Sequence, residues 1–529
     1  MRALSRVGFA DYSMAGYPGY PVVDPHFRRC SLFGADSGTT YRHSRNSGRE
    51  RSTMTQTFDA ARTFPKDFLF GAATAAYQIE GAAHEDGRTD SIWDAFSRVP
   101  GAVIDAHNGE VACDHYHRYE SDVELMAGLG LQTYRFSTSW SRIRPDGGPV
   151  NPTGIDFYSR LVDSLLEKNI KPWLTLYHWD LPQALQEKGG WANRDTAYLF
   201  EEYAHDVHAA LGDRVDAWTT LNEPWCSSFL SYIGGEHAPG IQDPETGLAA
   251  GHHLLLAHGL AVKNLRAADP TLQLGITLNL TVADPVDPTD AGDLDAARRI
   301  DGQFNRFFLD PIFRGSYPED LLADVSHLGF DKYVQPGDLD IISTPIDALG
   351  VNYYHGEAVS VHPAKVAMST AAPSERPKRS PFPAADDVFW HLRDLPLTAM
   401  DWEVQPEGLT RLLKRIHSEY TGDTVKLSVT ENGAAYNDEV APDGAVHDED
   451  RAEFLRLHLD AILDAIDEGV PVYGYFYWSL MDNFEWAWGY DKRFGIVRVD
   501  YDTQERTPKD SAIAYTRVIT GRTLPAVSG

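Results

Sequence analysis

Short apolar segments alternate with longer segments of helical periodicity along most of this chain. The short segments are dense in Val, Ile, Leu, Thr and aromatic residues, which is typical of parallel strands covered on both faces. Eight of them are expected to be strands: residues 68–74, 133–140, 171–179, 217–223, 274–280, 348–354, 426–431 and 472–480. Eight strands alternating with helices predict an α/β fold, a single (β/α)8 TIM barrel with elaborated loops at its C-terminal face.

The segments between the strands carry apolar residues at the spacing of amphipathic helices. One helix is expected to begin after Asp114, interpreted as its N-cap, and to run to Gly130. Two more have apolar stripes within residues 155–166 and 454–466. Acidic residues at 448–450 precede the last of these and suit the positive end of its dipole.

The first 57 residues differ from the rest of the chain. They are rich in Gly, Ser, Arg and Pro and have neither helical nor strand periodicity, so residues 1–57 are predicted to be a disordered N-terminal extension. A second interpretation is that Met54 is the true start and that the preceding residues are a gene-model artefact. The barrel is expected to span residues 58–525, with 526–529 as a short tail.

Residues 360–400 interrupt the alternation of strands and helices and contain several prolines. A loop of this length in a compact domain is usually functional or mobile. Since it follows the sixth strand, one interpretation is that it shapes the entrance of a cleft at the C-terminal face. A tolerated surface insertion is the other, and the sequence does not separate the two.

The formal net charge of −30 arises from 47 basic and 77 acidic residues among 529. This charge argues against nucleic acid and anionic membrane surfaces as partners and is compatible with a neutral ligand. No apolar segment is long enough to span a bilayer, and polar residues interrupt the N-terminus early, so a secretory signal is not expected. The oligomeric state stays open, a homo-oligomer included.

The chain has only three cysteines, an odd number: Cys30, Cys113 and Cys226. Their spacing suggests neither a disulfide framework nor a zinc site, which favours a reducing, cytoplasmic setting. His115 and His117 invite a metal interpretation, but residues two apart do not share a helix face. No metal and no cofactor are therefore expected.

Two of the predicted strands end in a glutamate followed by a helix or strand breaker. The sequence is Thr-Leu-Asn-Glu-Pro at 220–224 and Thr-Glu-Asn-Gly at 430–433. Barrel active sites form at the C-terminal strand ends, and two carboxyl groups there can serve as the acid/base and the nucleophile of glycosidic bond cleavage. Taken alone, Glu223 also fits a surface-loop acid, and Glu431 fits an Asn-Gly turn.

Other predicted strands also end in polar or aromatic residues rather than in plain turn residues. Buried hydrogen-bonding groups must each find a partner, and the hydroxyl groups of a sugar would satisfy many of them at once. The residues at or near these strand ends are Gln78, Arg135, His178, Trp179, Asn222, Asn352, Tyr354, Trp478, Glu485 and Trp486.

Five motifs of the chain resemble, in order, those of family 1 glycoside hydrolases, and in particular of bacterial β-glucosidases. One is Phe-Leu-Phe-Gly-Ala-Ala-Thr-Ala-Ala-Tyr-Gln-Ile-Glu-Gly at 68–81, and another is Leu-Tyr-His-Trp-Asp-Leu-Pro at 176–182. The two glutamate motifs and Trp-Ser-Leu-Met-Asp-Asn-Phe-Glu-Trp at 478–486 complete the set. The resemblance covers residues 60 to 525 and leaves out the N-terminal segment.

The resemblance implies a role for each matching residue. Glu223 would be the general acid and then the general base, and Glu431 would be the nucleophile. Asn222 would hold the sugar 2-hydroxyl and Asn352 would support the acid/base side. Arg135 and Tyr354 would keep Glu431 ionised. The residues implied to bind the sugar are Gln78, His178, Trp179, Trp478, Glu485, Trp486 and Phe494.

The resemblance further implies a retaining β-glucosidase that removes terminal non-reducing β-D-glucosyl residues, and also β-galactosides and β-fucosides. Its substrate would be a small β-glucoside or a short cello-oligosaccharide, as in cellulose degradation. Glu485 would repel a phosphate, which disfavours a 6-phospho-β-glycosidase. A β-galactosidase-preferring enzyme and a non-catalytic sugar-binding barrel stay open, and the leaving-group preference cannot be read from the loops.

Overall fold

The computed structural model describes residues 61–364, 376 and 378–525. The segment predicted to be disordered, Met54, the tail at 526–529 and the middle of the 360–400 segment lie outside the described residues.

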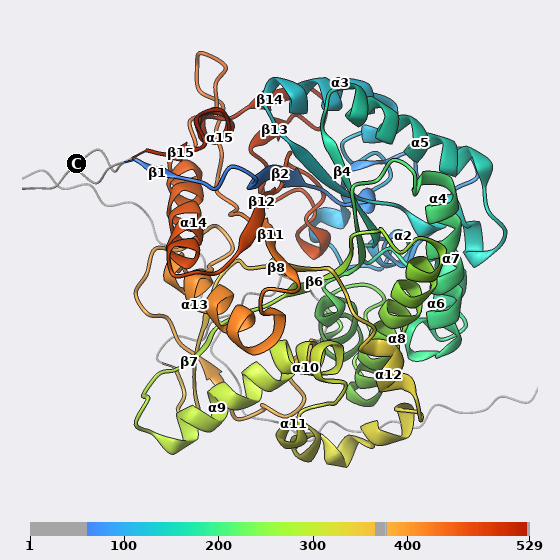
Figure 1. The fold of residues 1–529 in the computed structure, drawn as a ribbon, viewed down its shortest axis with the longest axis vertical. Helices are drawn as coiled ribbons and strands as arrows, with labels where there is room; N and C mark the ends of the chain where they lie inside the picture. The colour runs from blue at the N-terminus through green and yellow to red at the C-terminus, as the bar shows by residue number, and fades with distance from the viewer. Residues whose placement is uncertain (1–60, 365–375, 377, 526–529) are drawn as a thin grey trace, which may run out of the picture. The chain divides into compact units, whose positions relative to one another are not determined.

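Eight parallel strands close into a barrel in the order β11-β12-β2-β3-β4-β5-β6-β8 (Figure 1). The predicted single (β/α)8 barrel is therefore confirmed, and each predicted strand is present. The bounds are β2 Leu69–Ala73, β3 Thr133–Ser137, β4 Lys171–Tyr177, β5 Ala217–Asn222, β6 Leu274–Asn279, β8 Ala348–Asn352, β11 Lys426–Asn432 and β12 Val472–Trp478.

Helices surround the barrel strands, as Figure 1 shows. The long ones are α3 His115–Gly128, α5 Pro152–Glu167, α7 Asp195–Leu211, α8 Pro244–Ala268, α13 Pro406–Ile416, α14 Glu449–Asp467 and α15 Asp510–Gly521. The connection from β6 to β8 adds α9 Ala291–Asp301, α10 Phe307–Arg314, α11 Glu319–Asp324 and α12 Asp338–Ile342. Shorter helices are α1 Ala76–Ile79, α2 Ile92–Ser97, α4 Trp140–Ile143 and α6 Gln183–Gln186.

Small sheets lie outside the barrel. Strands β1 Arg62–Thr63 and β15 Thr523–Leu524 pair antiparallel, and so do β13 Val497–Val499 and β14 Arg506–Pro508. A three-stranded sheet joins β7 Ala283–Pro285, β9 Glu357–Ser360 and β10 Phe389–Trp390. Because β10 pairs back onto β9, part of the 360–400 segment has regular structure rather than forming a free loop.

Helix α3 begins where expected, but Asp114 does not cap it as predicted. Asp114 has a left-handed backbone (φ 52°) and its side chain makes no capping hydrogen bond to the helix. The carboxylate instead contacts the ring of His117 at 2.6 Å and accepts from Arg118 Nε at 3.0 Å. His115 contacts Asp122 at 2.8 Å, so the two histidines have separate carboxylate partners.

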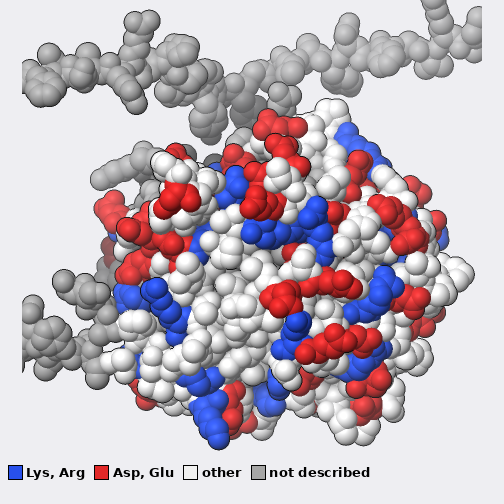
Figure 2. Space-filling view, turned by 90° about the horizontal axis from the view of Figure 1, so that it is seen from above, with Lys and Arg blue, Asp and Glu red and all other residues white. Residues whose placement is uncertain are grey.

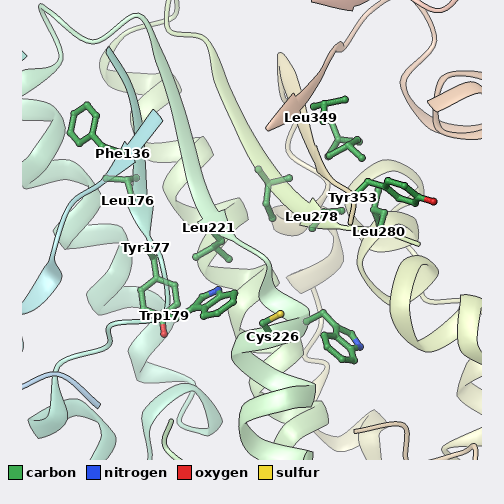
Figure 3. Close-up of a cluster of buried hydrophobic side chains, with 14 of the residues drawn as sticks. Phe136, Leu176, Tyr177, Trp179, Leu221, Cys226, Leu278, Leu280, Leu349 and Tyr353 are labelled. Atoms are coloured by element: carbon green, nitrogen blue, oxygen red, sulfur yellow. The ribbon is translucent and has the colours of Figure 1, made fainter. Parts of the chain in front are cut away.

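The barrel strands are buried along almost their whole length. Every residue of β3 and β5 is buried, and β4 and β11 expose only their first residues, Lys171 and Lys426. Figure 3 shows apolar side chains from neighbouring strands, among them Leu176, Leu221 and Leu278, meeting in this core. Polar side chains at the strand exits are thus placed where water cannot satisfy them, and they depend on one another for hydrogen bonds.

The charged side chains of the surface are interspersed rather than gathered by sign on the face that Figure 2 shows. Arg298, for example, pairs with Asp320 at 2.8 Å and with Asp324 at 2.9 Å. Within the described part of the chain, no helix is both long and apolar enough to cross a membrane.

We expect two Gly→Ala substitutions to act in opposite directions. A Cβ at Gly433, just beyond β11, would lie 1.7 Å from the carbonyl oxygen of Trp478 on β12, so Gly433→Ala must push the two strands apart. It should lower the free energy of unfolding by ~2 kcal/mol or more. A Cβ at Gly128, on the exposed end of α3, meets nothing within 4 Å, so Gly128→Ala should raise it by up to ~1 kcal/mol.

Urea unfolding of both variants measures the two changes. Equal effects of Gly433→Ala and Gly128→Ala would contradict the close approach of β11 and β12.

Candidate active site

A cavity of about 490 Å³ lies at the C-terminal ends of the barrel strands, where active sites of this fold form. Residues at the exits of six strands line it: His178 and Trp179 after β4, Glu223 after β5, Asn279 on β6, Asn352 and Tyr354 at β8, Glu431 on β11 and Trp478 on β12. Both glutamates singled out in the sequence therefore share one cavity.

The barrel register fixes where the two glutamates stand. Glu431 lies opposite Asn352 of β8, and the backbone N–H of Glu223 donates to the carbonyl oxygen of Thr277 at 3.0 Å. The exposed fraction is only 3% for Glu431 and 4% for Glu223. A carboxylate buried this deeply depends on the polar groups around it.

Two strong donors surround the carboxylate of Glu431. Arg135 Nη1 donates to Oε1 at 2.5 Å, and the hydroxyl of Tyr354 donates to Oε2 at 2.8 Å. The second nitrogen of the same guanidinium, Nη2, donates to Asn222 Oδ1 at 2.6 Å. Arg135 thus neutralises Glu431 and orients Asn222 at the same time.

Glu223 has only neutral partners. Asn352 Nδ2 donates to its Oε1 at 2.7 Å, and the thiol of Cys226 donates to its Oε2 at 3.2 Å. Among residues 61–364, 376 and 378–525, no ion pair involves Glu223. The two glutamates therefore occupy opposite environments, one charged and one neutral.

These environments shift the pKa values of the two carboxyl groups differently. Burial, followed by the negative charge of Glu431, raises the pKa of Glu223 to about 8. Burial also raises the pKa of Glu431, but the charge and hydrogen bond of Arg135 and the hydrogen bond of Tyr354 oppose that rise. Burial raises the pKa of the Tyr354 hydroxyl well above 10, so it keeps the proton that it donates. At neutral pH, Glu223 holds a proton in preference to Glu431.

A chain of hydrogen bonds fixes the tautomer of His178. Because Arg135 can only donate, Asn222 turns its Oδ1 toward it, and its Nδ2 then donates to His178 Nε2 at 3.0 Å. Burial lowers the pKa of His178 well below 6.5, so the ring is neutral. The imidazole consequently carries its proton on Nδ1, which has no hydrogen-bond partner in the described part of the chain.

Aromatic rings and a carboxyl group close the end of the cavity near His178. The ring of His178 stacks on Trp478 with centroids 5.6 Å apart and on Trp486 at 6.0 Å, and Trp179 packs on Trp486 at 4.6 Å. Burial, then the charges of Glu431 and Glu223, raises the pKa of Glu485 to about 8. This end therefore combines flat apolar faces with neutral hydrogen-bonding groups.

Several buried polar atoms around this end have no hydrogen-bond partner among the described residues. They include Gln78 Oε1, His178 Nδ1 and Glu485 Oε2. The Gln78 amide is oriented by donating to the carbonyl of Phe484 at 2.8 Å and to Asn483 Oδ1 at 3.1 Å, which leaves its oxygen unpaired. Buried polar atoms are normally paired, so these three indicate a place for a ligand with hydroxyl groups or for water.

Three residues at the site have a left-handed backbone although none is glycine. They are Trp179 (φ 77°), Glu223 (φ 46°) and Trp486 (φ 50°). Such conformations cost free energy and persist where surrounding structure enforces them, typically at functional sites. Here the left-handed backbone directs the side chain of Glu223, the first residue beyond β5, and the rings of Trp179 and Trp486 toward the cavity.

The structure separates the predicted site residues into two groups. Glu223, Glu431, Asn352, Tyr354, His178, Trp179, Trp478, Glu485, Trp486 and Phe494 line the cavity. Arg135, Asn222 and Gln78 are not among the lining residues. Arg135 and Asn222 contact residues that are, whereas the Gln78 amide donates to Asn483 and Phe484, which directly precede the lining residue Glu485 in the chain. Glu80, also a polar residue after the first strand, is engaged elsewhere by Arg142 at 3.0 Å and Tyr158 at 2.6 Å.

A second part of the cavity was not predicted residue by residue. Trp225 packs on Phe304 with centroids 4.5 Å apart and on Phe382 at 5.5 Å, and Phe382 packs on Trp390 at 5.5 Å. All four line the cavity, together with Cys226, Lys378, Arg379 and Trp402. Residues of the 360–400 segment thus help to shape the cleft, as one interpretation of the sequence expected. The only sequence signal for Trp225 and Cys226 is that they directly follow the first glutamate motif.

The comparisons with known proteins agree with this geometry. The family described as "Glycosyl hydrolase family 1" matches residues 60–523. A bifunctional β-D-glucosidase/β-D-fucosidase of Bifidobacterium breve is 49% identical over 473 residues, which cover 86% of this chain and 98% of that protein. A 1,4-β-D-glucan glucohydrolase of Thermotoga neapolitana is 46% identical over 461 residues, covering 87% of this chain and 98% of the relative.

Solved structures show the same likeness in three dimensions. The crystal structure of a psychrophilic β-glucosidase from Micrococcus antarcticus is 58% identical and superposes with a TM-score of 0.85, covering 87% of this chain and 98% of that one. The family match spans the whole barrel and includes every residue of the described cavity. The chain belongs to glycosyl hydrolase family 1.

Proposed function

We propose that the protein is a retaining β-glucosidase, which removes terminal non-reducing β-D-glucosyl residues by double displacement through a glycosyl–enzyme ester. Glu431 is the nucleophile, and Glu223 is first the general acid and then the general base. The observation that supports this assignment most strongly is the pair of glutamates in one cavity with opposite partners, Arg135 and Tyr354 on one side and uncharged groups on the other. Retaining glycosidases need such a pair in different protonation states at one pH.

In the first step, a carboxylate oxygen of Glu431 attacks the anomeric carbon as the bond to the leaving oxygen breaks. The proton of Glu223 passes to that oxygen, so the leaving group departs as an alcohol. Forming the ester removes the negative charge of Glu431. Since that charge helps to raise the pKa of Glu223, the pKa falls and Glu223 becomes a base.

In the second step, Glu223 takes a proton from water, and the hydroxide oxygen bonds to the anomeric carbon while the ester bond to Glu431 breaks. The sugar leaves with its original configuration after two inversions. Glu431 regains its charge, and the proton on Glu223 is again favoured. Each glutamate thereby sets the protonation state of the other through the cycle.

The unpaired polar atoms support a hydroxyl-rich ligand at the non-reducing end. We assign Gln78, His178 and Glu485 to its hydroxyl groups and the face of Trp478 to the apolar side of the ring. Glucosyl, galactosyl and fucosyl rings share most of these hydroxyl groups, so β-galactosides and β-fucosides are proposed as further substrates. Glu485 places a carboxyl group, rather than a cation that could pair with phosphate, at this end of the cavity, which favours unphosphorylated sugars.

Short cello-oligosaccharides are proposed as natural substrates, and the cytoplasm as the setting. The first is supported by the similarity to the Thermotoga neapolitana relative, a 1,4-β-D-glucan glucohydrolase. The second is supported by Cys113 and Cys226, which are both unpaired in the described part of the chain.

The two glutamates are expected to respond differently to azide. Glu431→Ala removes the nucleophile and should lower kcat by at least ~10⁴-fold. Azide then attacks from the emptied side and gives the α-glucosyl azide. Glu223→Ala should still form the ester from an aryl glucoside with a good leaving group, then stall, and azide should release the β-glucosyl azide. Proton NMR of the products distinguishes the two anomers.

An exchange of the two azide products would reverse the assigned roles. Absence of turnover of para-nitrophenyl β-glucoside by the unmodified protein, tested together with a panel of other β-glycosides, would instead favour a non-catalytic sugar-binding barrel.

Replacing Glu223 by glutamine is expected to stabilise the fold at alkaline pH. The folded state raises the pKa of Glu223 from 4.5 to about 8, so its stabilising contribution is complete below pH 4.5 and is lost as pH rises toward 8. Glutamine does not ionise, so Glu223→Gln should raise the free energy of unfolding at pH 8 by roughly 1–3 kcal/mol and by little at pH 4.

Denaturant unfolding at the two pH values measures the difference. The exposed Glu187→Gln serves as the control and should give no such pH-dependent gain. An equal gain for Glu223→Gln at pH 4 and pH 8 would contradict the raised pKa.

A further inference from the structure

The thiol of Cys226 is an immediate neighbour of the proposed acid/base. Its Sγ lies 3.2 Å from Oε2 of Glu223, while Asn352 Nδ2 lies 2.7 Å from Oε1. Each carboxyl oxygen of Glu223 therefore has its own neutral partner, an amide on one side and a thiol on the other. Cys226 also lines the cavity, although it is only 6% exposed.

The backbone holds this thiol in place. Cys226 begins a π-helical segment, Cys226–Gly234, and its backbone N–H donates to the carbonyl oxygen of Glu223 at 3.0 Å. Its own carbonyl accepts from Ser231 Oγ at 2.7 Å. Asn279 Nδ2, from β6, approaches the sulfur at 3.7 Å. Figure 3 shows Cys226 at the start of the helical segment that follows the strand carrying Leu221.

The sulfur keeps its proton in this environment. Burial, then the charge of Glu223, raises the pKa of the Cys226 thiol well above 9. A neutral thiol is a weak donor through S–H and a weak acceptor through sulfur, so it can face either protonation state of a carboxyl group. The amide of Asn352 has no such freedom, because its Oδ1 accepts from Thr430 Oγ1 at 2.8 Å and only its Nδ2 faces Glu223.

We propose that Cys226 is a positioning residue that exchanges hydrogen-bond roles with Glu223 in each half of the catalytic cycle. Because Asn352 can only donate, it holds Oε1 as the carbonyl oxygen of the protonated acid, which places the acidic proton on Oε2. Sulfur then faces the acid O–H, and after that proton has moved to the leaving group, the S–H donates to the resulting carboxylate. This inference rests on the proposed acid/base role of Glu223.

The weakness of the thiol donor suits this double role. A hydroxyl at the same place would donate more strongly to the carboxylate and would favour its ionised form, leaving less acid for the first step. A methyl group would offer no donor, so the carboxylate needed as base in the second step would be less stable. The donor strength of a thiol lies between that of a hydroxyl group and that of a methyl group, which cannot donate.

Two substitutions are expected to shift the pH dependence of kcat/KM in opposite directions. Cys226→Ser should move the alkaline limb, where the acid form of Glu223 is lost, to lower pH by about 0.5–1 unit. Cys226→Ala should move it to higher pH by a similar amount. With 2,4-dinitrophenyl β-glucoside, whose departure needs no acid, Cys226→Ala should also lower kcat about 3- to 10-fold, and azide should restore it because azide needs no base.

Cys113→Ser is the matched control. Its thiol is also buried and donates to a backbone carbonyl, that of Asp482 at 3.1 Å, but it does not line the cavity. This variant should leave the alkaline limb unchanged. Shifts of the Ser and Ala variants at 226 in the same direction, or shifts no larger than that of Cys113→Ser, would overturn the proposal.

Infrared spectroscopy supplies a second measurement, made on the unmodified enzyme. It follows the S–H stretching bands, and the band that is lost in Cys226→Ser belongs to Cys226. This band should move to lower frequency as Glu223 ionises, and the Cys113 band should stay constant. A Cys226 band that does not change between pH 6 and pH 9 overturns the proposal. The azide products of Glu223→Ala test the acid/base role separately.

Discussion

A single buried guanidinium organises the catalytic end of the barrel. Arg135 is completely buried, and it donates to Glu431 at 2.5 Å and to Asn222 at 2.6 Å. Asn222 Oδ1 also accepts from Asn352 Nδ2 at 3.1 Å, and the same amide donates to Glu223 at 2.7 Å. One continuous path of hydrogen bonds thus joins both glutamates through side chains of four strands. Removing Arg135 would leave the buried carboxylate of Glu431 without a counter-charge, which is among the costliest defects in a protein.

The same path separates the two protonation states. Only one end of it carries the positive charge, so the ionised form is favoured at Glu431, and the proton is favoured at Glu223. Glu485 places a further carboxyl group near the two catalytic glutamates, and the charges of Glu431 and Glu223 help to raise its pKa. Gathering these acids at one end of the cavity destabilises the empty barrel, which the extensive core elsewhere must offset. Buried, charged and strained residues at one site therefore lower the stability of the fold, and the catalytic role of the site explains why they are kept.

The sequence was sufficient for the barrel because buried parallel strands have a strong local pattern. Every strand was located, whereas the structure ends β3 at Ser137 rather than at residue 140, since backbone hydrogen bonds and not composition set the boundary. Most of the site residues that were predicted lie at or just beyond strand exits, where the barrel topology brings them together. Asp114 shows the limit, because side-chain partners such as His117 and Arg118 decide whether a carboxylate caps a helix. Phe304, Phe382 and Trp390 were missed because long-range packing, with no local pattern, brings them to the cavity.

The two ends of the cavity select by different physical means. Around His178 and Glu485, unpaired polar atoms make each missing hydroxyl group costly, so a ligand lacking one leaves a buried atom unsatisfied. Around Trp225 and Phe382, the walls are aromatic and discriminate weakly among flat apolar groups. Selection of the sugar should then depend on the hydroxyl groups that glucosyl, galactosyl and fucosyl rings share, while many leaving groups are accepted. Glu223 and Cys226 stand at the boundary between these ends, where a proton must reach leaving oxygens of different chemistry, and a neutral, adaptable partner suits an acid with that task.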